Sequence, residues 1–214
     1  MTTRAVMSAM VLIACSIATG AFAQSTVLDA KRRTELSSGS SAQRTEVLAW
    51  LAEHGSQSDT PAVVPRLQDA DQRIRALAES TLWSMWLRSG DDQADAWMNE
   101  GSTLATAAEY DSAIAVFTRV IQRLPDFAEA YNKRATVLYL KGDYEGSLAD
   151  IATTLKINPA HFGALSGAGL CMIKLHRPDE ALFYFERGLA VNPNMDGIRD
   201  MVNALHSSNP RPRA

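Results

Sequence analysis

The side chains whose chemistry could support catalysis or metal binding are few and scattered along the chain. The four histidines stand at positions 54, 161, 176 and 206, and no HExxH or CxxC spacing is present. The segment GALSGAGLC around Ser166 matches neither G-x-S-x-G nor G-x-G-x-x-G, and no strand pattern precedes it. We therefore expect no catalytic residue, no metal ion and no cofactor.

A second group of polar residues, Asn132, Lys133 and Arg134, crowds the start of an amphipathic helix in the stretch AYNKRATVLYLKGDYEGSL. Arg134 falls near an apolar stripe that includes Tyr131 and Ala135. A polar side chain on a core face indicates either a ligand site or a pair with a neighbouring segment. The choice depends on what lies beside this helix.

Composition and charge disfavour some classes of partner. The 214 residues include 21 basic and 24 acidic side chains, which give a net charge of −3, and only the terminal RPRA is locally basic. Phosphate binding needs a concentrated positive surface, so no nucleic-acid partner is expected. The hydrophobic content of 46% is ordinary for a protein with a real core.

The N-terminal residues 1–23 have the pattern of a secretory signal peptide. One positive charge, Arg4, precedes an apolar run from Ala5 to Ala18, and Ala21-Phe22-Ala23 forms a small-x-small cleavage site. The run is too short to span a bilayer comfortably, since a span needs about 20 residues. We expect a mature protein that begins at Gln24, is exported to a bacterial periplasm and is not stably inserted in the membrane.

An alternative for the same segment is a lipoprotein. Leu12-Ile13-Ala14-Cys15 resembles a bacterial lipobox, in which Cys15 would carry the lipid. Cleavage after Ala23 would instead remove Cys15 and leave Cys171 as a lone thiol, which excludes an intramolecular disulfide. Because apolar residues surround Cys171, we expect it to be buried and unreactive.

An internal repeat is visible in three prolines. Pro125, Pro159 and Pro193 are each 34 residues apart, and the same offset superimposes residues of matching type along the whole stretch from 94 to 194. Small residues coincide at Gly101, Ala135 and Gly169, where they let paired helices approach closely. The pattern predicts helix pairs at 94–107 and 110–123, 128–141 and 144–157, and 162–175 and 178–191.

These features resemble three tetratricopeptide repeats, whose pattern is W-x2-L-G-x2-Y, then A-x3-F, then P. The resemblance implies an all-α solenoid of stacked helical hairpins that binds a segment of a partner protein in a concave groove lined by the first helix of each pair. By register, the predicted groove residues are Met98, Ser102, Asn132, Lys133, Thr136, Tyr139, Ser166, Leu170 and Ile173. Repeats that grip a C-terminal carboxylate use a Lys and an Asn in the first unit. Met98 and Ser102 stand there instead, so that mode is not expected.

The chain departs from the repeat pattern where Leu is expected, at Glu100, Arg134 and Ala168. Glu100 and Arg134 occupy equivalent places on adjacent stacked helices and carry opposite charges. We predict a structural ion pair between them that ties two repeats together, rather than a catalytic arginine.

The segments that flank the repeats complete the solenoid. Residues 195–206 form an amphipathic helix whose stripe, Ile198, Met201, Val202 and Leu205, is typical of a terminal cap. Residues 207–214 are expected to be a disordered tail. On the N-terminal side, 24–41 is a polar linker with a weak helix, and 42–93 resembles a HEAT-type helical hairpin on the run from Leu67 to Arg75. Both repeat types stack helix pairs, so the two could form a single solenoid, with Trp83 and Trp86 at the junction.

The function expected from these observations is that of an exported, non-enzymatic protein–protein interaction module. One alternative is an envelope-assembly scaffold or chaperone-like adaptor that holds several proteins at once. Another is a small-molecule binder or hydrolase accessory that uses the small-residue patch 166–171. A co-purified protein would favour the adaptor hypothesis, and a ligand bound in the patch would favour the small-molecule hypothesis.

Overall fold

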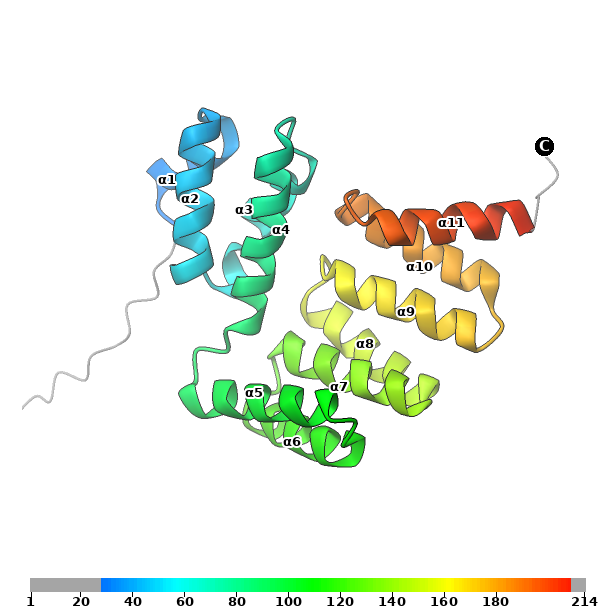
Figure 1. Cartoon of the computed structure of the whole chain (residues 1–214). Coiled ribbons are helices and arrows are strands. Elements are labelled where there is room, and N and C mark those ends of the chain that lie inside the picture. Colours follow the sequence, from blue (N-terminus) through cyan, green and yellow to red (C-terminus); the bar gives the residue numbers. More distant parts are fainter. Residues whose placement is uncertain (1–27, 209–214) are drawn as a thin grey trace, which may run out of the picture.

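The repeat region forms six helices in three antiparallel pairs. The computed structural model describes residues 28–208, and within them the pairs are α5 (Asp92–Thr106) with α6 (Tyr110–Arg123), α7 (Ala128–Lys141) with α8 (Tyr144–Ile157), and α9 (Phe162–Lys174) with α10 (Pro178–Val191). Figure 1 shows the pairs stacked one on another. The predicted all-α solenoid is confirmed, and each predicted boundary lies within two residues of the observed one.

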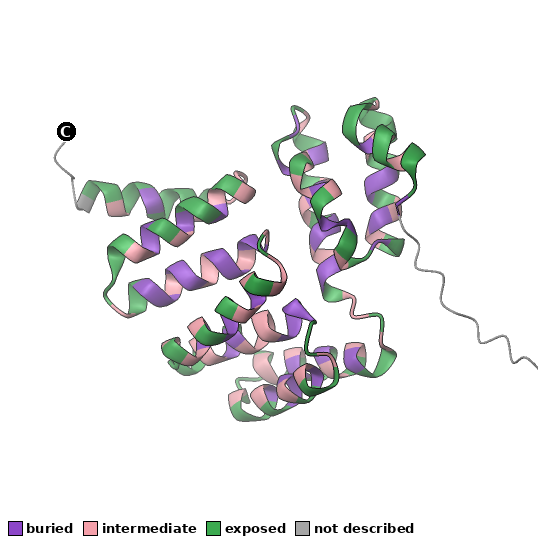
Figure 2. Ribbon diagram, turned by 180° about the vertical axis from the view of Figure 1, so that it is seen from behind, coloured by how far each residue is buried: buried purple, intermediate pink, exposed green. Residues whose placement is uncertain are grey.

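The paired helices approach closely, and this explains why small residues recur at the equivalent repeat positions Gly101, Ala135 and Gly169. Equivalent positions in successive repeats are called a column below. A Cβ added to Gly169 would lie 2.3 Å from Phe185 Cε1, and one added to Gly101 would lie 2.7 Å from Phe117 Cε1. Both phenylalanines are at most 1% exposed. Each ring therefore fills the space that a glycine leaves open, and Figure 2 shows buried residues along the inner sides of the paired helices.

The turn inside each pair uses the same left-handed backbone position. Ala108, Gly142 and His176 lie 34 residues apart and have φ of 60°, 90° and 58°. Glycine adopts this conformation freely, whereas it costs an ordinary residue about 1–2 kcal/mol. The repeat geometry therefore imposes the turn even where the sequence supplies alanine or histidine.

Helix α11 (Asp196–Ser208) covers the last pair. Ile198, Val202 and Leu205 pack against the core around α10, as predicted, whereas Met201 is 42% exposed, so its assignment to the buried stripe was wrong. In the column of Gly101, Ala135 and Gly169, this helix has Asn203. A polar residue at that place suits the open end of a solenoid. Ser207 and Ser208 still belong to α11, and the rest of the predicted tail lies outside the described residues.

Four helices and two 3₁₀ turns form a separate N-terminal bundle: α1 (Ala30–Ser38), α2 (Ser41–His54), η1 (Gln57–Asp59), α3 (Thr60–Val63), η2 (Val64–Gln68) and α4 (Gln72–Leu87). Its core contains apolar stripes from α2 (Val47, Leu48 and Leu51) and α4 (Ile74, Ala78, Leu82 and Met85). The segment expected to be a polar linker is packed into the same core, because Leu28 and Leu36 are each 1% exposed. Two leucines were enough to anchor a helix whose other residues are mostly polar.

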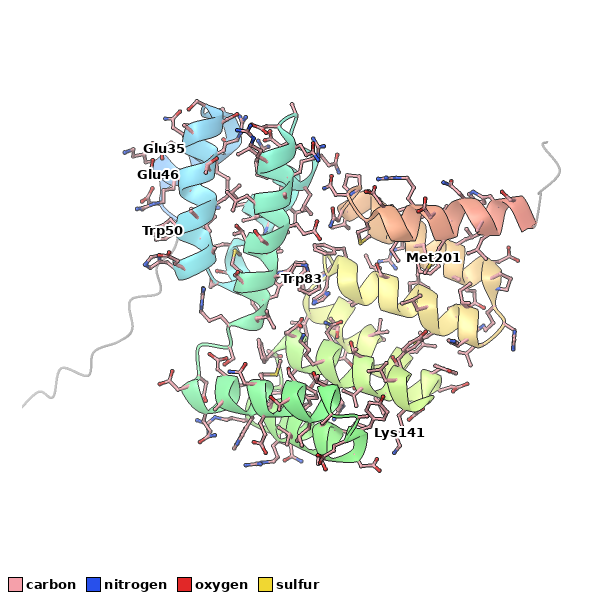
Figure 3. All side chains as sticks on the ribbon, viewed as in Figure 1. Glu35, Glu46, Trp50, Trp83, Lys141 and Met201 are labelled. Carbon is pink, nitrogen blue, oxygen red and sulfur yellow. The ribbon has the colours of Figure 1, made fainter. Side chains whose placement is uncertain are left out.

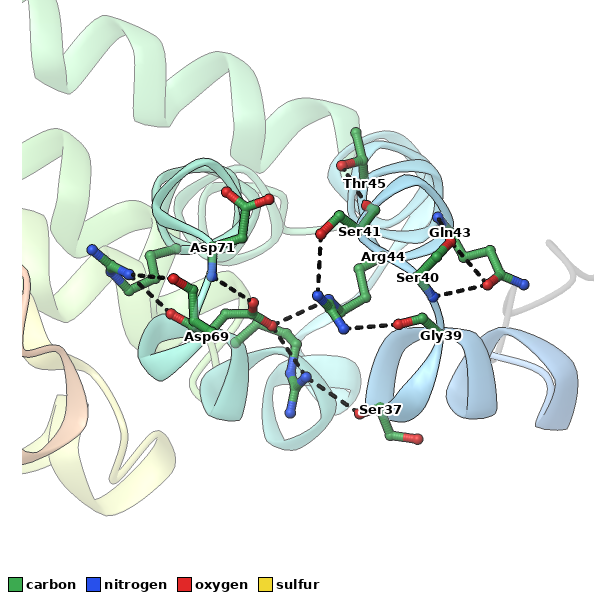
Figure 4. Close-up of polar contacts among 12 residues, drawn as sticks. Ser37, Gly39, Ser40, Ser41, Gln43, Arg44, Thr45, Asp69 and Asp71 are labelled. Carbon is green, nitrogen blue, oxygen red and sulfur yellow. Dashed lines mark hydrogen bonds and ion pairs between the residues drawn. The ribbon is translucent and has the colours of Figure 1, made fainter.

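Asp69 holds the bundle together at one end (Figure 4). Its carboxylate lies 3.2 Å from Arg44 Nε and 3.2 Å from Arg66 Nη1. The two arginines also donate to the carbonyls of Gly39 and Ser37 in and beside the α1–α2 turn. Asp69, one of the residues behind the resemblance to a HEAT-type hairpin, therefore ties that turn to the start of α4.

The bundle does not continue the solenoid. Instead, α4 runs across the N-terminal ends of the first helices of the repeats, and Figure 3 shows Trp83 between α4 and the start of α9. Arg75 Nε donates to Asn194 Oδ1 at 3.0 Å, and Asn194 Nδ2 donates to the Leu67 carbonyl at 2.8 Å. Trp83 and Trp86 do fill a junction, but with Phe162 and His161 of the third repeat rather than with the first.

Candidate functional site

The face that carries the predicted groove residues is formed by the first helices of the repeats, α5, α7 and α9. Between α7 and α9 the face is hollowed into a cavity of about 90 Å³. Four of the predicted groove residues line it together: Asn132, Thr136, Tyr139 and Leu170.

Two further predicted groove residues, Met98 and Ser102, lie in a different hollow. It lies between α4 and α5, has a volume of about 280 Å³, and is also lined by Leu87, Arg88 and Asp95. The N-terminal bundle therefore supplies one wall of the groove beside the first repeat. Sequence register could not reveal this wall, because α4 is outside the repeats.

The remaining three predicted groove residues line neither hollow. Ser166 Oγ donates to the Phe162 carbonyl at 2.9 Å, which satisfies it within its own helix. Ile173 is 37% exposed at the C-terminal end of α9. Lys133 Nζ lies 3.7 Å from Glu129 Oε1, so it forms an ion pair within α7.

A network of buried polar residues lies at the N-terminal end of α9, and the sequence analysis did not predict it. Glu129 and His161 are both 0% exposed, and His161 Nε2 lies 2.8 Å from Glu129 Oε2. His161 Nδ1 accepts from the Ala164 backbone N–H at 3.0 Å as the N-cap of α9, so Nε2 carries the proton and donates to Glu129. Trp86 stacks on the imidazole with ring centroids 4.5 Å apart.

The network also orients a groove residue. Asn132 Nδ2 lies 3.3 and 3.2 Å from the two Glu129 oxygens, so the side-chain amide is fixed from below. A signal for the network was available in the sequence. His161 stands in a column whose other members are Phe127 and Met195, so a polar residue replaced an apolar one there.

The predicted pair between Glu100 and Arg134 was wrong. Arg134 Nε and Nη2 each donate to Asp150 at 2.7 Å, and Nη1 donates to Thr118 Oγ1 at 2.9 Å. This part of α7 faces α8 and the preceding α6, not the equivalent part of α5. Glu100 has no earlier repeat to face and is exposed. Asp150 was detectable, because its column otherwise contains Val116 and Tyr184.

The arginine is held as a structural group rather than presented to a ligand. Its hydrogen bonds to Asp150 raise the pKa of the Arg134 guanidinium above its ordinary value, against the opposing effect of burial. Two parallel bonds from one guanidinium to one carboxylate are the strongest geometry for such a pair. The interpretation of Arg134 as one member of a structural ion pair was therefore correct, but the predicted partner was wrong.

The glycines of α9 have different surroundings. A Cβ on Gly163 would lie 2.6 Å from Trp83 Cη2, and one on Gly169 would meet Phe185. A Cβ on Gly167 would meet only Ile151 Cδ1, at 3.4 Å, and Gly167 lines the cavity between α7 and α9.

Cys171 lies behind this surface. It is 0% exposed and its Sγ lies 3.3 Å from Ser147 Oγ. Burial raises the pKa of the thiol, so the nucleophilic thiolate is disfavoured. The expectation of a buried cysteine is confirmed.

Within residues 28–208, no cluster of three or more His, Cys, Asp or Glu side chains could hold a metal ion. None of the helices in this range is long and apolar enough to cross a membrane.

Comparisons with known proteins agree with the geometry. Residues 107–188 match the family described as anaphase-promoting complex, cyclosome, subunit 3. A TPR repeat-containing protein of Rhizobium etli is 31% identical over 56% of this chain, and anaphase-promoting complex subunit 3 of Schizosaccharomyces pombe is 28% identical over 52%. The chain spans 59% of the length of the first relative and 17% of the second.

Two solved structures share the fold. The first TPR domain of Spaghetti (RPAP3), bound to an HSP90 peptide, has a TM-score of 0.54 and 20% identity, and the match covers 56% of this chain and 97% of that one. The TPR2B domain of yeast Sti1, in a complex with pHsp70, has a TM-score of 0.52 and 19% identity, and covers 56% and 100%. With its 34-residue period and paired helices, the chain shares the fold of these tetratricopeptide-repeat structures.

Proposed function

We propose that the protein is an exported, non-enzymatic adaptor that binds an extended segment of another protein on the concave face of its repeats. The observation that carries the proposal is the cavity between α7 and α9, where residues from two repeats and the first helices of both meet. Concave, mostly apolar hollows with a few polar groups are typical binding sites.

The similar structures support the class of ligand. The RPAP3 domain was solved with a peptide of HSP90 and the Sti1 domain with pHsp70, so this fold accepts short protein segments. Met98 and Ser102 occupy the places of the clamp residues in the first repeat, so we do not extend the carboxylate-gripping mode to this chain.

Export to a bacterial periplasm is part of the proposal. It is supported by the signal-peptide pattern of residues 1–23, which lie outside the described part of the chain. Intact mass and N-terminal sequencing of protein recovered from the periplasm should give Gln24 as the first residue. A lipidated N-terminal Cys15 would contradict this and anchor the protein to a membrane.

Partner capture tests the binding face. Thr136 is exposed at the cavity, and its Oγ1 donates to the carbonyl four residues earlier. Thr103 of α5 makes the same bond and is exposed, but it does not line the cavity. Envelope proteins captured with the wild type should be lost with Thr136→Arg and retained with Thr103→Arg. Equal capture by the two variants would move the site away from the α7–α9 face.

A further inference from the structure

We propose that the cavity between α7 and α9 is an anchor pocket for one branched aliphatic side chain of the bound segment. This inference rests on the proposed function and names the chemistry that the site selects. The apolar part of the lining comes from Ile151, Leu170, Ala135 and the ring of Tyr139, and none of the described residues that line the cavity is charged. A volume of about 90 Å³ suits one such side chain.

Gly167 provides an independent argument for an open pocket. Glycine in a helix interior is unfavourable relative to alanine, so its presence there calls for a reason. Gly163 and Gly169 have one, because a Cβ at either place would clash with an aromatic ring. At Gly167 the nearest atom is Ile151 Cδ1 at 3.4 Å, an ordinary contact. Packing does not require glycine there, but any larger residue would reduce the cavity that Gly167 and Ile151 both line.

The polar group beside the pocket fits the backbone of an extended segment. The carboxylate of Glu129 can only accept hydrogen bonds, so the amide nitrogen of Asn132 must face it. Asn132 Oδ1 is then left as an acceptor at the cavity, where a backbone N–H next to the anchoring residue could donate to it. The carboxylate of Glu129 would repel an acidic anchor side chain, and no cation among the described lining residues would attract one. Both features disfavour an acidic anchor.

The test uses a small probe that presents one side chain between two amide groups. N-acetyl-leucine N-methylamide is titrated into ¹⁵N-labelled protein, and the amide shifts of Gly163, Gly167 and Ala135 are followed. N-acetyl-glutamate N-methylamide is the comparator. The leucine probe should bind at least about tenfold more tightly than the glutamate probe, because only its side chain transfers favourably to an apolar pocket.

Gly167→Leu fills the pocket, and Gly197→Leu is the matched control. Gly197 lies in α11 with no atom within 4 Å of its added Cβ. Gly167→Leu should weaken the leucine probe by about tenfold or more, whereas Gly197→Leu should leave affinity within about twofold. Circular dichroism and thermal unfolding show whether each variant is folded. If Gly167→Leu does not fold, Leu170→Asp should weaken the probe in the same way.

The outcomes separate this inference from the proposed function. Equal binding of the two probes, or unchanged binding in folded Gly167→Leu, overturns the anchor pocket. If folded Gly167→Leu still captures the protein partner that Thr136→Arg loses, the proposed binding face is retained and only the anchor pocket is rejected. If the leucine probe binds as expected but Thr136→Arg captures partners normally, the pocket stands and the proposed function falls.

Discussion

The repeat array and the N-terminal bundle are held in place by contacts of different range. In the array, Arg134 and Asp150 are only 16 residues apart, and each helix packs on its neighbours in sequence. The bundle is fastened to the array by contacts such as Arg75 with Asn194, which are 119 residues apart. A repeated local interface can be stabilised unit by unit, whereas a docking edge depends on a few residues that occur once.

The buried pair of Glu129 and His161 lies where the bundle docks on the array, and a change to this pair should have the largest effect on stability. In His161→Ala the Glu129 carboxylate loses a buried partner, α9 loses its N-cap, and Trp86 loses a stacked ring. We expect the free energy of unfolding to fall by about 3–5 kcal/mol in urea titrations, because a buried carboxylate loses a hydrogen-bond donor and a cavity replaces the ring. The matched change His206→Ala, at an exposed position of α11, should alter it by less than about 0.5 kcal/mol. Similar effects of the two would mean that the network does not stabilise the docking edge.

Inside the array, Arg134→Ala tests the strongest local pair. It leaves Asp150, whose side chain is 9% exposed, without its guanidinium, while the arginine itself is 20% exposed. Because solvent reaches part of this pair, we expect a loss of about 2–4 kcal/mol, slightly below the fully buried case.

The control for this prediction is Glu100→Ala, which should change stability by less than about 0.5 kcal/mol because the side chain is exposed and outside any ion pair in residues 28–208. A double-mutant cycle should give a large coupling energy between Arg134 and Asp150 and almost none between Arg134 and Glu100. The reverse result would restore a pair between first helices.

Two glycines of α9 compare the regions directly. Gly169→Ala drives a methyl group into Phe185, which is 0% exposed and cannot move aside, so we expect a loss of about 1–3 kcal/mol. Gly163→Ala presses on Trp83, which is only partly buried and can shift, so its loss should be smaller. Thermal unfolding measures both changes, and tryptophan fluorescence should change only for Gly163→Ala. A larger loss at Gly163 would make the docking edge the more tightly packed region.

The smallest effect is expected where the two regions meet. Asp91 is the N-cap of α5, and hydrogen bonds from Arg123 and from the backbone of Ala94 hold the pKa of its carboxyl below its usual range. A folded-state pKa below the unfolded value contributes stability that is present at neutral pH and is lost as pH falls through the folded value.

Asp91→Asn keeps a capping residue but removes the charge. The variant should unfold at a slightly lower temperature than the wild type at pH 7, and the two should converge as the pH falls below the usual range of an aspartate. Unfolding midpoints measured between neutral and acidic pH test this. A difference that stays constant with pH would show that the charge does not contribute.

Register arguments predicted the helices and part of the candidate site. Asn132, Thr136, Tyr139 and Leu170 line one cavity because equivalent places on successive first helices share a face. Register failed for Ser166, which bonds to its own helix, and for the partner of Arg134. A repeat column gives a residue's place on its helix, but the neighbouring helix that its side chain reaches depends on packing.

The sequence by itself determined the repeat fold, because the 34-residue period, the small-residue column and the closing prolines act over short distances. It also determined the core stripes of α2 and α4, whose apolar spacing needs no distant partner. Only the tertiary structure decided that α4 lies across the array, that Trp86 covers His161, and that Glu129 is buried beneath Asn132. These contacts join residues without a shared period, so they depend on complementary shape and on satisfying buried polar groups, which a single chain read in order does not reveal.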